Sequence, residues 1–316
     1  MINLLQADIQ ISIQDLGRKR PKQNGFYGGA VDRQALILAN RLLGNQDNSP
    51  TLEFCARVFC KRELSSGALV LYFQQTSWIA LTGADFDARV EDRPLRSGWR
   101  AKVNAGERLF IHGPKTGIYG YLAILGGIAN ISGMTEQAGG SLCKHLKADA
   151  CLSLNPPKNQ ISRPIGVIQR VNDGILRALP GAELDLFTTS SRKSFWAKEW
   201  ILAAQSSRSA AFLEGESLSS AIKIATQTAL APNPNLPGTV QVSEQGKVSI
   251  SLADNQNTGN YPVIARVIEA DLWKVAQRQP GQRFTFEHVS PNQVESANYE
   301  WQQYFERLAR MLHRNS

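Results

Sequence analysis

The chain has 316 residues, of which 42% are hydrophobic and 20% are charged, as in an ordinary globular protein. This length suits about two cores of usual size, and the composition excludes a disordered chain and a coiled coil. The formal net charge of +8 is spread along the sequence, and its densest basic cluster, residues 18–22, has no interleaved aromatic side chains. We therefore expect no nucleic-acid partner.

No segment of the sequence predicts export or membrane insertion. The start of the chain lacks a basic run, and its apolar residues are interrupted by Asn3, Gln6 and Asp8, unlike a signal peptide. Residues 116–135 carry no charge but include five glycines, which favours a buried strand and a turn over a membrane helix. We expect a cytoplasmic protein that does not bind a membrane.

The four cysteines have neither the close spacing of a metal or redox site nor a neighbouring histidine cluster: Cys55, Cys60, Cys143 and Cys151. We expect free, buried thiols and no metal site.

Most of the chain is predicted to form short strands, because compact or alternating apolar runs are separated by glycine, proline, asparagine and charged residues. These runs cover residues 68–73, 78–82, 108–111, 118–125, 175–179, 240–242, 248–252 and 283–286. Residues 240–252 alternate on both sides of a polar turn and predict a hairpin. The sequence therefore predicts a mainly β protein.

Three helices are predicted by their end signals. Asp32 can cap the first, and Gly44 follows its last apolar position. The second covers residues 268–277. The third follows Ser290, with proline at its first position and Gln293 in the place of a capping box. Its apolar stripe is expected to pack on the body of the protein.

Residues 155–165 are predicted to be a linker, because two successive prolines cannot donate hydrogen bonds to a sheet and the flanking residues are polar. The expected domains are an N-terminal β-rich domain, residues 1–154, and a C-terminal domain, residues 166–316.

Familiar catalytic motifs are absent: the sequence contains no HExxH, GxSxG, Walker A or GxGxxG pattern. No residue can be identified from it as a nucleophile or a base. Three polar segments could instead hold a ligand: residues 14–18, 204–208 and 254–262. Each combines donors, acceptors or a guanidinium with residues that permit a tight turn. The alternatives are a loop ion pair for the first and ordinary exposed polar turns for the other two.

Many ordered motifs resemble the allophanate hydrolase subunit 2 family, also called the biotin-dependent carboxyltransferase-like family. Gln14-Asp15-Leu16-Gly17-Arg18 resembles the family's Q-D-x-G-R. It is followed, in the family's order, by Gly28-Gly29-Ala30-Val31-Asp32, residues 39–45, Leu52-Glu53, residues 81–84, residues 121–128, residues 177–181, residues 236–242, the Asp254 loop and residues 268–272. The resemblance covers nearly the whole chain and is strongest to the C subunits of bacterial 5-oxoprolinases.

This resemblance implies tandem cyclophilin-like β-barrel domains with a few short helices and a C-terminal helix. It implies one component of an ATP-dependent 5-oxoprolinase-like complex, a hydrolase that opens the cyclic amide 5-oxoproline to glutamate. The implied partners are the B subunit, which resembles allophanate hydrolase subunit 1, and the A subunit. ATP would be a co-substrate of the complex, not necessarily bound by this chain, and biotin is not excluded. The alternatives are a carboxyltransferase-type subunit that uses carboxybiotin on urea-like amides, and a divergent non-catalytic partner-binding regulator.

The resemblance also implies the site. We expect the small-molecule substrate to be bound by Ser206, Arg208, Asp254, Thr258, Gly259 and Tyr261, with Arg208 holding an anion and Tyr261 donating from its hydroxyl. The site would be shaped by Asp15, Arg18, Asp32, Asn40 and Glu53. This chain departs from the family in both substrate loops. Ala211 and Phe212 replace the aromatic ring and second guanidinium of S-D-R-M-G-Y-R, and Val263 replaces the cation after the D-x-Q-T-T-G-G-Y-P loop. These departures favour the non-catalytic alternative.

Overall fold

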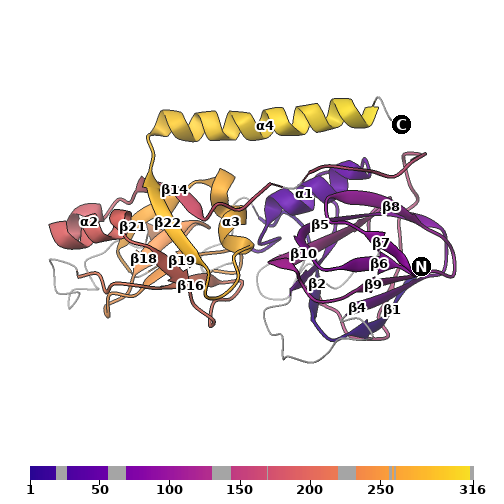
Figure 1. The fold of residues 1–316 in the computed structure, drawn as a ribbon, viewed down its shortest axis with the longest axis horizontal. Helices are drawn as coiled ribbons and strands as arrows, with labels where there is room; N and C mark the ends of the chain where they lie inside the picture. Colours follow the sequence, from indigo (N-terminus) through magenta and orange to yellow (C-terminus); the bar gives the residue numbers. More distant parts are fainter. Residues whose placement is uncertain are drawn as a thin grey trace. The chain divides into compact units, whose positions relative to one another are not determined.

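Two antiparallel sheets and a closed β-barrel dominate the computed structural model (Figure 1). The structure describes residues 1–18, 27–55, 69–129, 144–168, 170–219, 233–255, 258–259 and 261–313. The chain divides into two compact units. Unit 1 contains residues 1–17, 32–171 and 306–316, and unit 2 contains residues 18–31 and 172–305. The fold class expected from the sequence, mainly β with few helices and a C-terminal helix, is confirmed.

Unit 1 contains two sheets of mostly short strands. The six-stranded sheet has the order β12 (Cys151–Leu152), β1 (Ile2–Ala7), β4 (Leu69–Phe73), β9 (Arg108–Ile111), β6 (Ala88–Val90) and β7 (Arg93–Leu95). The seven-stranded sheet has the order β11 (Lys144–His145), β2 (Gln10–Gln14), β3 (Thr51–Cys55), β10 (Thr116–Ile124), β5 (Ser77–Asp85), β8 (Trp99–Val103) and β13 (Ile165–Gly166). Apolar side chains from both sheets form one core.

The seven-stranded sheet is covered on both faces, which explains why its central strands are buried along nearly their whole length. One face contributes Leu52, Leu81 and Leu122 to the core. The other face lies under α1 (Arg33–Leu42), which packs on β5 and β10 (Figure 1). Because strand side chains alternate, every second residue of these strands points to the helix instead of the core.

The sequence signals of α1 are confirmed. The Asp32 carboxylate accepts a hydrogen bond from the Ala35 amide at 2.9 Å, so Asp32 caps the helix as predicted. After the helix, Gly44 adopts a φ of +68°, which a residue with a side chain tolerates poorly.

Unit 2 contains a closed barrel of seven strands. Their order is β14 (Ile175–Pro180), β21 (Val263–Val267), β18 (Thr239–Val242), β19 (Val248–Ser251), β16 (Ala210–Glu214), β15 (Trp200–Leu202) and β22 (Arg283–His288). The predicted hairpin is confirmed, with Val240 opposite Ile250 and Val242 opposite Val248. A separate two-stranded ladder joins β17 (Asn233–Pro234) and β20 (Thr258–Gly259).

Short helices cover parts of the barrel. The sequence analysis missed α2 (Thr189–Ala197), whose residues are mostly polar and bury only Ser191 and Phe195. The Phe195 ring stacks on Phe286 of the barrel at 4.4 Å between ring centroids. The predicted helix over residues 268–277 forms as a 3₁₀ turn, η3 (Glu269–Asp271), followed by α3 (Leu272–Ala276). Another 3₁₀ turn, η1 (Leu184–Leu186), precedes α2.

The C-terminal helix α4 (Pro291–His313) begins as predicted. The Ser290 amide donates to Oε1 of Gln293 at 2.8 Å, which is half of a capping box. Ala297, Phe305 and Leu308 of the predicted apolar stripe are buried, as expected for packing on the protein. No helix in the described parts of the chain combines the length and the hydropathy needed to cross a bilayer.

The compact units differ in extent from the predicted ranges, and the predicted domain boundaries stay a prediction. Residues 155–165, predicted as a linker, belong to unit 1. There the Asn159 side chain donates to the Gly44 carbonyl at 2.6 Å, and the Asn155 amide donates to the Gly127 carbonyl at 3.1 Å. Prolines interrupt a sheet ladder, but the asparagines beside them supply hydrogen bonds that anchor the segment.

Buried thiols were expected at all four cysteines. Cys55 is a buried thiol, as expected, but Cys151 is an exposed thiol, so the expectation is wrong there. Cys151 lies on β12, an edge strand, where its neighbour Leu152 takes the core-facing position. Cys60 and Cys143 lie outside the described residues.

A prediction about unit 1 concerns the pair of Gly120 on β10 and Phe54 on β3, which face each other across the ladder. A Cβ atom at Gly120 would lie 2.2 Å from Cε2 of Phe54, a fully buried ring. We expect Gly120→Ala to lower the free energy of unfolding by about 1–3 kcal/mol in urea denaturation, through overpacking.

The double variant Gly120→Ala/Phe54→Leu is the control. Removing the ring edge makes room for the methyl group, so the double variant should lose less stability than the sum of the two single variants. Strict additivity would show that steric overlap is not the cause.

Candidate functional site

A row of polar side chains crosses the seven-stranded sheet of unit 1 on the face under α1. The strand register places Ser12 opposite Glu53, Glu53 opposite Tyr121, and Tyr121 opposite Thr82. All four are buried. Buried polar groups need hydrogen-bond partners, so this row forces specific contacts between the sheet and the helix.

Tyr121 is the centre of these contacts. Its hydroxyl donates to Oε2 of Glu53 at 2.8 Å and accepts from the backbone amide of Asp32, also at 2.8 Å. Complete burial raises the pKa of the Tyr121 hydroxyl well above its ordinary value, and the negative charges of Glu53 and Asp32 raise it further. Two predicted site-shaping residues, Glu53 and Asp32, are thus joined through a tyrosine.

Asn40, also predicted to shape the site, is completely buried, and its side chain forms hydrogen bonds within unit 1. Its side-chain amide donates to the Ser49 carbonyl at 2.9 Å and to the Thr51 hydroxyl at 3.1 Å. Its carbonyl oxygen accepts from the Asn45 amide at 3.2 Å. Asn40 therefore ties α1 to the segment that enters β3.

Asp15 is partly buried, and its carboxylate accepts from the Gly17 amide at 2.7 Å. Burial raises the pKa of Asp15, although the Gly17 hydrogen bond and the positive charge of Arg33 act in the opposite direction. Arg18 belongs to unit 2, where its backbone amide donates to the Tyr27 carbonyl at 2.9 Å.

In unit 2, the predicted ligand Ser206 is used to hold its own turn. The hydroxyl donates to the Ala203 carbonyl at 2.8 Å and accepts from the Phe212 amide at 3.0 Å. The residue is buried. The hydroxyl therefore donates one hydrogen bond and accepts another within this turn. The turn leads into residues 207–209.

Arg208 forms a forked ion pair with Asp254, with 2.6 Å from Nε to Oδ2 and 3.1 Å from Nη2 to Oδ1. Nη2 also donates to the Gly29 carbonyl at 2.6 Å. Gly28 and Gly29 have φ values of +63° and +82°, and the Gly28 amide donates to the Ala253 carbonyl. The Arg208 side chain is only 10% exposed, so it fastens two loops together; its predicted role as an anion holder stays a prediction.

The rest of the predicted substrate loop follows Asp254. Thr258 and Gly259 form β20, paired with β17, and Tyr261 is 41% exposed. Asn255 is buried, and its amide donates to the Asn235 carbonyl at 2.9 Å. Its Oδ1 atom has no hydrogen-bond partner among the described residues. The structure thus brings Arg208 and Asp254 together and leaves Tyr261 exposed.

Sequence reasoning missed two features of these sites. Tyr121 was recognised only as part of a family motif, although a tyrosine within an apolar strand implies a buried hydroxyl that needs a partner. Asn235 was not singled out, because its proximity to Asn255 depends on the barrel. In the described parts of the chain, no group of three or more histidine, cysteine, aspartate or glutamate side chains could hold a metal.

The Tyr121 contacts predict a pH-dependent stability difference. Tyr121→Phe removes two buried hydrogen bonds and should lower the free energy of unfolding by about 1–3 kcal/mol at pH 7. Because the folded pKa is raised, the wild-type advantage is complete below the unfolded tyrosine pKa, about 10. It should then shrink by about 1.4 kcal/mol per pH unit as pH rises above 10.

Urea denaturation of both proteins between pH 7 and pH 11 measures this difference. The other tyrosines are common to both proteins, so the comparison isolates Tyr121. A difference that stays constant up to pH 11 would contradict a raised pKa.

The Arg208–Asp254 pair predicts a loss of stability in unit 2. Arg208→Ala breaks the fork and the bond to Gly29, and we expect a loss of about 1–3 kcal/mol. The matched control is Arg283→Ala, which removes a much more exposed ion pair with Glu199 and should cost less than about 1 kcal/mol. Thermal unfolding measures both variants, and equal losses would argue against a fastening role for Arg208.

Comparison with known proteins places these features in a family. The model of the carboxyltransferase domain, subdomains A and B, matches residues 26–288. The C subunit of the 5-oxoprolinase of Escherichia coli (strain K12) is 35% identical and aligns over 99% of this chain and 99% of its own length. The protein of the same name from Haemophilus influenzae is 32% identical, again over 99% of both chains.

A solved structure shows the same fold. The crystal structure of the Kluyveromyces lactis urea amidolyase superposes with a TM-score of 0.81 and 22% identity, covering 97% of this chain and 20% of that chain. This chain therefore corresponds to about one fifth of that larger protein. From the match over residues 26–288 and the full-length identity to two relatives, this chain belongs to the family of carboxyltransferase domains, subdomains A and B.

Proposed function

We propose that this protein is one component of an ATP-dependent 5-oxoprolinase-like complex that opens 5-oxoproline to glutamate. The observation that carries the proposal is the 35% identity to a protein named as the C subunit of 5-oxoprolinase, over 99% of both chains. The alignment therefore extends over both units and the C-terminal helix, and is not limited to one shared domain.

The chemistry of the reaction explains why several subunits and ATP would be needed. The lactam carbonyl of 5-oxoproline is a poor electrophile, and opening the ring adds water across the C–N bond. One coupled ATP hydrolysis would supply the driving force. The proposed partners are the A and B subunits of such a complex, with ATP as its co-substrate. The role of this chain would be to orient the anionic substrate through placed hydrogen-bond donors.

Within this proposal the unit 2 site divides into fastening and binding groups. Arg208 and Ser206 are occupied by internal hydrogen bonds, so they would position the loops and not contact substrate. Tyr261 is exposed and would donate its hydroxyl to a substrate carboxylate or carbonyl.

The experiment reconstitutes the complex. The chain is co-expressed with the A and B subunits of a 5-oxoprolinase, and glutamate release and ATP hydrolysis are measured with 5-oxoproline. We expect Tyr261→Phe to lower kcat/KM about 10- to 100-fold, the loss of one hydrogen bond to a charged group, without loss of thermal stability. Tyr299→Phe, an exposed tyrosine on α4, is the matched control and should have no effect.

Two alternative functions give different results in the same experiment. A carboxyltransferase-type subunit would assemble with a biotin-carrying partner and carboxylate urea-like amides, as the fold shared with the urea amidolyase allows. A non-catalytic partner-binding regulator would form a stable heteromer without turnover. The internal pairing of Arg208 favours this last alternative, because it leaves one cation fewer for a substrate.

A further inference from the structure

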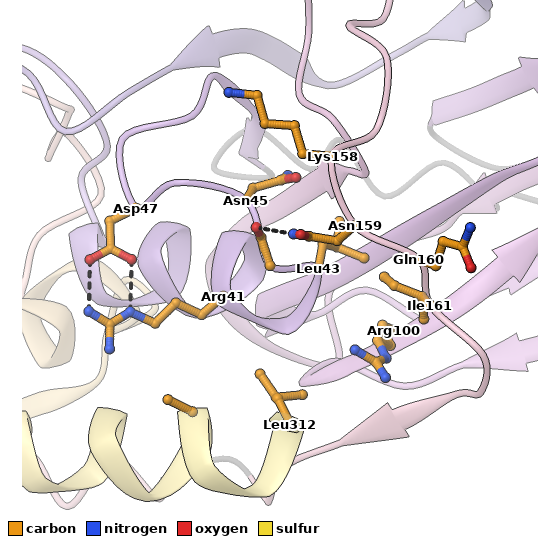
Figure 2. Close-up of a pocket in the computed structure, with 12 residues that line it drawn as sticks. Arg41, Leu43, Asn45, Asp47, Arg100, Lys158, Asn159, Gln160, Ile161 and Leu312 are labelled. Carbon is orange, nitrogen blue, oxygen red and sulfur yellow. Dashed lines mark hydrogen bonds and ion pairs between the residues drawn. The ribbon is translucent and has the colours of Figure 1, made fainter. Parts of the chain in front are cut away.

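Unit 1 contains a pocket of about 700 Å³ outside the sites described above. Its walls come from the end of α1 and the loop after it, strand β8, residues 158–161, and the last turns of α4 (Figure 2). All these segments belong to unit 1. The contributing residues of α4 follow the part of the chain that the family model matches, which ends at residue 288.

Arg100 of β8 is an unusual wall residue because its charge is buried. The residue is 5% exposed. Its guanidinium donates from Nη1 to the Leu42 carbonyl at 2.8 Å and from Nε to the Arg163 carbonyl at 3.1 Å. Nη2 has no hydrogen-bond partner, and no carboxylate lies within ion-pair distance of Arg100, among the residues that the structure describes.

A buried cation without a counterion is costly, and the pKa of Arg100 shows this cost. Burial lowers that pKa, and the positive charge of Arg163 lowers it further. An anion supplied from outside the chain would offset the cost and would pair with Nη2.

The other charged residues leave the pocket positive. Arg41 is neutralised by a forked ion pair with Asp47, at 2.7 and 2.8 Å, on the opposite side from Arg100 (Figure 2). Lys158 is exposed, and its ammonium group points away from Arg100 (Figure 2). Asp47 is thus paired with Arg41 and does not balance the charge of Arg100.

The uncharged part of the wall indicates the size and polarity of a ligand. The Asn45 amide is committed to the Ile124 carbonyl at 2.9 Å, and the Asn159 amide to the Gly44 carbonyl at 2.6 Å. Leu43, Ile161 and Leu312 supply apolar surface. A ligand that suits this wall has one anionic group and an apolar remainder.

We propose that this pocket binds a small organic monocarboxylate, whose carboxylate pairs with Arg100 and whose apolar part rests on Leu43, Ile161 and Leu312 (Figure 2). A carboxylate matches the planar fork of a guanidinium. Nη2 is covered by its neighbours, so binding includes a small side-chain movement that uncovers it. Because Leu312 lies on α4, the bound ligand also holds the end of that helix against unit 1.

The test titrates the full-length protein with acetate, butyrate and hexanoate, followed by ligand-observed saturation-transfer NMR. Affinity should rise roughly fourfold for each methylene that is buried on the apolar wall. Inorganic phosphate, the other common anion, should bind more weakly than hexanoate. Phosphate binding tighter than hexanoate, or no dependence on chain length, would overturn the assignment of a monocarboxylate.

Two exposed residues give variants that leave the buried guanidinium intact. Lys158→Gln should weaken hexanoate binding less than about threefold, because its exposed ammonium group points away from Arg100 (Figure 2). Gln160→Glu places a carboxylate at the same wall and should weaken binding at least 10-fold by competition and repulsion. The matched controls, Lys147→Gln and Gln75→Glu, make the same charge changes at exposed positions that do not line the pocket.

Hydrogen exchange locates the ligand independently of these variants. Hexanoate should slow amide exchange in residues 306–313 of α4 and in residues 158–161. Protection elsewhere without protection there would overturn the proposal, as would unchanged affinity in Gln160→Glu. Because the experiment uses this chain without its partners, neither result depends on whether the protein supports 5-oxoprolinase activity.

Discussion

The constraint on which unit 1 depends is that a sheet covered on both faces must bury every second residue under a helix. In β3, β5, β8 and β10 the core-facing positions are apolar, whereas the positions under α1 include Glu53, Thr82, Arg100 and Tyr121. Each of these polar groups must find a partner away from water. Thr82 donates to the Ala35 carbonyl at 2.7 Å, and Tyr121 joins Glu53 to the start of the helix. The helix is therefore placed by hydrogen bonds as well as by apolar contact.

The same constraint has two outcomes along one helix. At its start, the Tyr121 hydroxyl forms hydrogen bonds with both Asp32 and Glu53. These bonds join the start of the helix to the sheet. At its end, Arg100 donates to the Leu42 carbonyl, but no acidic side chain in the described chain compensates its charge. A polar layer that is complete at one end and incomplete at the other is a reason to look for a ligand at the incomplete end.

The barrel and the loops of unit 2 are held by different side chains. The barrel strands bury Leu176, Val240, Ile250 and Phe284. The loops are fastened separately, by Ser206 within one turn and by Arg208 between Asp254 and Gly29. Ala211 and Phe212, where the family has an aromatic ring and a guanidinium, lie on the barrel strand β16. Ala211 is buried opposite Ile250, whereas Phe212 is exposed. Side-chain chemistry can change at an exposed strand position while the fold persists.

The sequence by itself determined the elements that depend on neighbouring residues. Period-two patterning placed the hairpin over residues 240–252, Asp32 and Ser290 marked the starts of two helices, and the ordered motifs identified the family. It could not show that Arg208 is occupied by Asp254 and Gly29, or that Tyr121 meets Glu53, because those contacts join strands and loops far apart in the chain. Only the tertiary structure decided them. Local propensity acts over a few residues, whereas strand register and the pairing of buried charges depend on which segments the whole fold brings side by side.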